Sequence, residues 1–161
     1  MEPVNPTKQL QAALGRIVSG MFIITAGQGE DETGMLASWV QQCSFDPPLV
    51  SVALRKGREI ASWLPEGARF IVNILDDTQT DMLIHFGRGF SEKEPAFADV
   101  DVERIDGSPP ILKDALAFLD CRVANRCITG DHELIIGQVV AGRLLGEGHP
   151  MVHIRKSGGH Y

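Results

Sequence analysis

The C-terminal half of the sequence contains strand-like segments with no helical segment between them. Residues 117–128 alternate apolar and polar side chains, a turn follows at 129–131, and a second apolar segment covers 133–142. Parallel neighbours need a crossover, usually a helix, whereas antiparallel strands can be joined by a tight turn. This half of the chain therefore disfavours a doubly wound parallel fold and favours an antiparallel sheet.

The remaining segments predict a chain that is mainly β with short helices. Further strands are expected over 21–25, 35–45, 49–54, 69–75 and 151–154. Short helices are expected where apolar residues recur at helical spacing, at Leu10, Leu14 and Ile17, at Ile60, Trp63 and Leu64, and at Met82, Leu83 and Phe86. Many short strands with few helices fit an antiparallel barrel, and we expect residues 1–161 to form one domain.

Polar, glycine-rich or proline-rich segments separate these elements. Residues 1–6 are expected to be a loose terminus that leads into a helix start at Asn5 and Pro6, residues 27–34 a polar turn, and residues 87–110 a long loop. Long loops in compact domains often carry function.

Composition excludes several classes of protein. With 43% hydrophobic and 22% charged residues, the chain resembles a globular protein and not a disordered one, and no apolar run is long enough to span a membrane. The net charge of −6 argues against nucleic acid as a partner. Three cysteines without a CxxC pair suggest reduced thiols, buried as small apolar residues, in a cytoplasmic protein.

Common nucleotide, metal and hydrolase motifs are absent from the sequence. No GxGxxG follows the first strand, and no P-loop, HExxH or GxSxG occurs. His149 and His153 have ligand-like spacing, but Pro150 prevents a regular helix between them, so no metal site is predicted.

A basic turn follows the strand over 49–54. Arg55, Lys56 and Arg58 surround Gly57, which allows a tight turn. A guanidinium beside an ammonium suits a phosphate monoester. The alternative is a solvated turn whose charge Glu59 balances.

Two other segments carry candidate binding residues. Trp39 stands among the small residues of Ala37–Val40, where backbone N–H groups beside a flat apolar wall could hold a planar heterocycle. His132 ends the tight turn that begins at Gly130, and its imidazole could donate or exchange a proton. The alternatives are an ordinary core tryptophan and a histidine that simply begins a strand.

Together these segments resemble the flavin reductase-like family, whose fold is an FMN-binding split β-barrel. The matching segments are GMLASWVQQCSFDPPLVSVAL, RFIVNIL, GSPPILKDALAFLDCRV and GDHELIIGQV, and they run from about Leu14 to Tyr161. Within the family, the chain looks like the C-terminal flavin reductase domain of cyanobacterial diflavin flavodiiron proteins. It has no room for the other domains of those proteins, so we expect a stand-alone relative or an excised domain.

The resemblance implies non-covalent FMN, with FAD as the alternative, and NADH or NADPH as electron donor. By position, Ala37, Ser38, Trp39 and Val40 would line the flavin ring, and Ala53 and Leu54 the ribityl chain. Arg58 and Ile60 replace the Ser and Thr that many members place near the phosphate, which shifts phosphate binding to Lys56 and Arg58. His85, Phe86 and Arg88 would border the flavin, and His132 would position the nicotinamide as the catalytic residue.

The implied function is an NAD(P)H:flavin oxidoreductase that passes electrons to free flavin, dioxygen or a partner protein. A homodimer with the flavin near its interface is also implied. Two alternatives stay open, namely a flavin-binding electron carrier with no nicotinamide site and a related split barrel that binds haem or another ligand.

Overall fold

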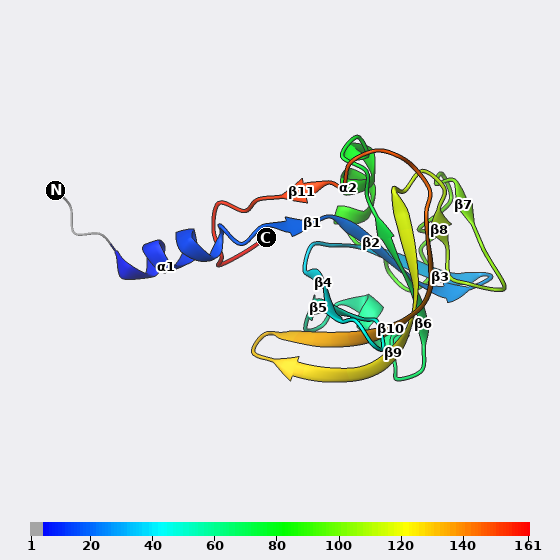
Figure 1. Cartoon of the computed structure of the whole chain (residues 1–161), viewed down its shortest axis with the longest axis horizontal. Helices are drawn as coiled ribbons and strands as arrows, with labels where there is room; N and C mark the ends of the chain where they lie inside the picture. Colours follow the sequence, from blue (N-terminus) through cyan, green and yellow to red (C-terminus); the bar gives the residue numbers. More distant parts are fainter. Residues whose placement is uncertain (1–4) are drawn as a thin grey trace.

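Seven strands form one antiparallel sheet in the order β3-β2-β6-β9-β10-β5-β4, in a computed structural model that describes residues 5–161 (Figure 1). The strands of this sheet are β2 Phe22–Gln28, β3 Asp31–Ala37, β4 Val40–Ser44, β5 Leu49–Arg55, β6 Arg69–Ile74, β9 Ala117–Thr129 and β10 His132–Leu144. Two small ribbons accompany it, β1 Ser19–Gly20 with β11 Val152–His153, and β7 Val102–Glu103 with β8 Ile111–Leu112. The helices are α1 Pro6–Leu14, the 3-10 helix η1 Glu59–Trp63 and α2 Thr80–Gly87. The predicted mainly antiparallel β fold is confirmed.

The sheet is open along one seam. Its two edge strands, β3 and β4, follow each other in the sequence but do not pair with each other. Ser38 and Trp39 connect them, and the Ala53 N–H donates to the Trp39 carbonyl at 2.9 Å, which fixes this connection against β5. The segment that the sequence singled out around Trp39 therefore lies at the opening of the barrel.

The hairpin of β9 and β10 brings the two candidate turns together. Gly130 adopts φ 51° at the hairpin tip, a conformation that glycine takes without the steric cost of a side chain. His132 then lies opposite Arg55 in the β10–β5 register, and the Lys56 N–H donates to the Asp131 carbonyl at 3.0 Å. The basic turn and the histidine turn are thus neighbours at one end of the sheet.

The interior of the rolled sheet is filled by apolar residues of several strands. Phe70, Ile24, Leu54 and Ile135 are fully or almost fully buried there. A second cluster lies under α2, where Phe86 contacts residues of the 87–110 loop. That loop is mostly irregular, as predicted.

One buried ion pair fastens the long loop to the sheet. Arg69 on β6 binds the Asp120 carboxylate with two nitrogens, at 2.9 and 2.6 Å. The same guanidinium donates to the carbonyl oxygens of Ile105 and Asp106. The alternating pattern placed Asp120 on the exposed face of its strand, but the structure buries it because Arg69 supplies its counter-charge.

Three predictions about local structure need correction. The expected polar turn over 27–34 is mostly strand, because β2 and β3 form a hairpin whose turn is only residues 29–30. The expected strand over 35–45 is two strands, β3 and β4, separated at the seam. Of the three cysteines, only Cys121 is buried, whereas Cys43 and Cys127 are exposed.

The predicted N-terminal helix is present. The Asn5 side chain caps α1 by accepting from the Thr7 N–H, as its position before Pro6 predicts. The apolar face of Leu10, Leu14 and Ile17 is nevertheless exposed, since α1 projects away from the sheet (Figure 1). The first four residues of the expected loose terminus lie outside the described residues.

Candidate functional site

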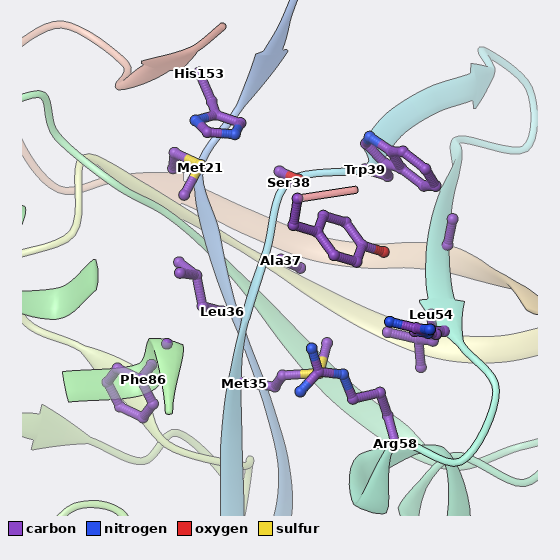
Figure 2. Close-up of a pocket in the computed structure, with 14 residues that line it drawn as sticks. Met21, Met35, Leu36, Ala37, Ser38, Trp39, Leu54, Arg58, Phe86 and His153 are labelled. Carbon is purple, nitrogen blue, oxygen red and sulfur yellow. The ribbon is translucent and has the colours of Figure 1, made fainter. Parts of the chain in front are cut away.

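A pocket of about 210 Å³ opens at this seam, where residues of β3 and β5 line it (Figure 2). Residues from four parts of the chain line it. They are Met35, Leu36 and Ala37 of β3, Ser38 and Trp39 of the connection, Ala53, Leu54, Arg55 and Arg58 at the end of β5 and in the turn after it, and Met21, Phe86, Gly87, His153 and Tyr161 from more distant parts. The walls are mainly apolar, with cationic side chains at the end of β5. Such a site suits a flat ring that carries an anionic tail.

Several predicted flavin-binding residues meet in this pocket. They are Ala37, Ser38, Trp39, Ala53, Leu54, Arg58 and Phe86. Figure 2 shows Trp39 and Arg58 at opposite ends of the opening, with Leu36 and Ala37 on the β3 side and Leu54 on the β5 side. Their roles toward a ligand remain predictions, but the fold brings together segments that the sequence separates.

Other predicted residues lie outside this pocket. Val40 packs against the main core, and Lys56 is exposed on the turn. His85 bonds the Ala96 carbonyl at 2.7 Å and so fastens α2 to the long loop. Arg88 pairs with Glu94 at 2.6 Å and lies over the Phe90 ring.

His132 belongs to a cluster beside Trp39. Its Nδ1 atom lies 2.7 Å from the Asp131 carboxylate, and its Nε2 atom is hydrogen bonded to the Tyr161 hydroxyl. Because a carboxylate only accepts, the neutral imidazole carries its proton on Nδ1 and accepts the Tyr161 proton at Nε2. The ring centroids of Trp39 and His132 are 4.7 Å apart, and those of Trp39 and Tyr161 are 5.3 Å apart. The histidine orientation is therefore fixed from both sides.

The C-terminal residues form part of this site, which the local sequence patterns did not indicate. The Gly158 N–H donates to the Gln11 carbonyl at 2.6 Å, so α1 holds the end of the chain in place. A Cβ atom at Gly158 would lie 2.1 Å from the Leu14 Cβ, so only glycine allows this close approach. The contact places Tyr161 at the pocket.

Neighbouring groups and burial shift the pKa values of Asp131 and Tyr161. The hydrogen bond from His132 lowers the pKa of Asp131, which keeps it a carboxylate. Burial raises the pKa of Tyr161, although Arg58, Arg55 and Arg155 each oppose that shift. Tyr161 is thus a neutral phenol that donates to His132, surrounded by arginines in a chain of net charge −6.

The same site offers no ligand set for a metal ion. Within residues 5–161 no group of three or more His, Cys, Asp or Glu side chains could hold one. No helix in that range is long and apolar enough to cross a membrane.

Comparison with protein families gives one match over most of the chain. The family described as flavin reductase like domain matches residues 14–159. Diflavin flavoprotein A 1 of Synechocystis sp. is 44% identical over 154 residues, which is 94% of this chain and 27% of that protein. The chain therefore spans little more than a quarter of this relative.

Solved structures of flavin reductases are also similar to this chain. The NADH:FAD oxidoreductase of Streptomyces globisporus superposes with a TM-score of 0.81 and 26% identity, over 99% of this chain and 95% of that one. The flavin reductase of the styrene monooxygenase of Pseudomonas putida S12 has a TM-score of 0.74 and 28% identity, over 89% of this chain and 90% of that one. Both resemble this chain over nearly their whole length.

Proposed function

The chain belongs to the flavin reductase-like family of oxidoreductases, and from that premise we propose that it holds FMN non-covalently at the seam of its barrel and reduces it with NADH or NADPH. The observation that carries the proposal is the pocket between β3 and β5, with Arg58 at the end of β5 and Trp39 beside His132. Bound FMN would supply a ring that accepts hydride from a nicotinamide.

The residues of the pocket fit FMN by their chemistry. Met35, Leu36 and Phe86 give an apolar wall for a flat ring, and Arg58 gives a guanidinium for the phosphate. Ser38 is buried at the seam, where polar groups can meet the polar edge of the ring. A neutral apolar ligand would leave Arg58 without a role in the site.

His132 would position the nicotinamide and would not act as a nucleophile. Its Nδ1 proton is engaged by Asp131 and its Nε2 by Tyr161, so the imidazole is held rigidly beside the Trp39 face. Rigid side chains that hold two reactants in a fixed orientation lower the entropic part of the barrier.

Replacing His132 with alanine should therefore slow reduction and leave flavin binding unchanged. We expect NADH to reduce bound FMN about tenfold more slowly in anaerobic stopped flow. This is a small rate loss for an enzyme that loses one group that orients its substrate. The matched control is His149→Ala, which removes an exposed histidine that does not line the pocket. Unchanged reduction in His132→Ala would remove His132 from the reaction.

Steady-state assays separate this function from that of an electron carrier without a nicotinamide site. With added FMN, the protein should consume NADH or NADPH continuously and pass electrons to free flavin, dioxygen or a partner protein. A carrier would bind FMN and turn yellow but would not oxidise either donor. A haem-binding split barrel would instead show a haem spectrum.

We also propose a homodimer, which the exposed apolar residues of the N-terminal arm support. Leu10 on α1 and Ile17 just after it are 60% and 62% exposed, and the nearby Val152 and Ile154 are both 60% exposed. Exposed apolar groups that gather in this way are typical of interfaces. Light scattering should give twice the chain mass of 17.5 kDa, and Leu10→Glu with Ile17→Glu should give the single mass. A wild-type protein of single mass would contradict the dimer.

The cytoplasm is the proposed location. Cys43, Cys121 and Cys127 are all free thiols, which supports a reducing compartment.

A further inference from the structure

A second pocket adjoins the first on the side of His132. Its volume is about 260 Å³, and it lies between the turn at Asp131 and the C-terminal residues that include Arg155. Trp39, Arg55 and Tyr161 line both pockets. A ligand that extended from one pocket into the other would therefore contact these three side chains.

Arg155 is a buried cation in this second pocket. Only 8% of its surface is exposed, and its Nε atom has no hydrogen-bond partner. It takes part in none of the ion pairs found among residues 5–161. Buried polar groups without a partner are rare, and a buried charge without a counter-charge is costly. A bound anion would therefore stabilise Arg155 at this position.

The aromatic face below Arg155 does not meet that need. The guanidinium carbon lies 4.9 Å from the centroid of the Trp39 ring, which stabilises the positive charge. A ring face does not, however, satisfy the N–H donors at the edge of the guanidinium, which need acceptor oxygens. The ring instead holds the planar group in one orientation.

The surroundings of the pocket carry surplus positive charge. The positive charges of Arg55, Arg58 and Arg155 each lower the pKa of Tyr161. Asp131 is the acidic side chain whose charge raises it. Asp131 is engaged by His132. Glu133, the next acidic residue along β10, is paired with Arg126. Neither carboxylate is therefore bound to Arg155.

We propose that Arg155, with Arg55, binds the diphosphate of the nicotinamide dinucleotide whose ring lies against Trp39 and His132. This inference rests on the proposed function and adds the residues that hold the donor. The guanidinium fork matches phosphate oxygens with two parallel hydrogen bonds. The shared wall of the two pockets places this anion site next to the predicted nicotinamide position.

The test compares Arg155→Met with the wild type, both loaded with FMN. Methionine keeps an unbranched apolar side chain and removes the charge. Calorimetric titration with NAD⁺ should give a Kd raised roughly 10- to 100-fold, as expected for loss of a charged hydrogen-bonding group. Arg155→Lys keeps the charge without the fork and should lose less. Arg122→Met, at an exposed arginine of β9, is the matched control and should bind NAD⁺ as the wild type does.

A donor without phosphate separates anion binding from a structural effect of the variant. Reduced nicotinamide riboside should reduce bound FMN equally fast in the wild type and Arg155→Met, whereas NADH at sub-saturating concentration should react more slowly only in the variant. Inorganic pyrophosphate should compete with NADH in the wild type and lose this effect in the variant.

Three results would overturn the proposal. They are an unchanged Kd for NAD⁺, an equal loss with the phosphate-free donor, or a loss of FAD affinity with NAD⁺ affinity unchanged, since the last assigns the diphosphate to a flavin. Failure of the proposed function is a separate result, because the wild type itself would then not reduce FMN with any nicotinamide donor.

Discussion

Replacing Arg58 with alanine should weaken FMN binding by roughly 10- to 100-fold, whereas Lys56→Ala should change it by less than about threefold. Both residues lie on the turn after β5, and the sequence alone suggested that both hold the phosphate. Both side chains are exposed, but only Arg58 lines the seam pocket. Quenching of flavin fluorescence measures both affinities.

Riboflavin provides the control for this pair of variants, because it carries the same ring without the phosphate. Arg58→Ala and the wild type should bind riboflavin equally if Arg58 acts on the phosphate. A larger loss of FMN affinity in Lys56→Ala than in Arg58→Ala would place the phosphate on the other side of the turn.

The second large effect is expected at the ion pair inside the fold. Asp120→Ala should lower the free energy of unfolding by about 3–5 kcal/mol, because it leaves the Arg69 guanidinium buried without its counter-charge. The side chains of Arg69 and Asp120 are only 16% and 9% exposed, so solvent only partly replaces the lost carboxylate. For a chain of this size, such a loss lowers the melting temperature by roughly 10 °C.

A matched exposed pair serves as the control for Asp120→Ala. Asp101 pairs with Lys113 at 3.0 Å, but these side chains are 68% and 49% exposed. Exposed pairs contribute little, so Asp101→Ala should change stability by less than about 1 kcal/mol. Urea unfolding of the two variants checks the difference. Equal losses would mean that burial of the Arg69 pair adds nothing.

Much of the site could be predicted from the sequence because its residues lie in short continuous segments. Ala37, Ser38 and Trp39 are adjacent, and Ala53 and Leu54 end an evident strand. The apolar segment 49–54 and the glycine turn after it marked the end of that strand, and antiparallel pairing placed this end beside the turn at His132. The mostly antiparallel fold followed from the same local patterns.

The rest of the site depends on contacts between distant parts of the chain. Arg155 and Tyr161 reach the site only because α1 holds Gly158, and no local pattern reveals a contact between the first and last segments. The spacing of Leu10 and Leu14 predicted the helix α1, but periodicity does not say what its apolar face packs against. Asp120 was placed on the exposed side because alternation cannot reveal a partner such as Arg69 on the neighbouring strand.

The central claim is that FMN bound at the seam takes electrons from a nicotinamide, and an anaerobic titration of the FMN-loaded protein with NADH and then NADPH tests it most directly. We predict that the visible absorbance of the oxidised flavin disappears with about one equivalent of at least one donor and returns when air is admitted. An FMN-loaded protein whose spectrum stays oxidised with both donors would contradict the account and leave an electron carrier without a nicotinamide site.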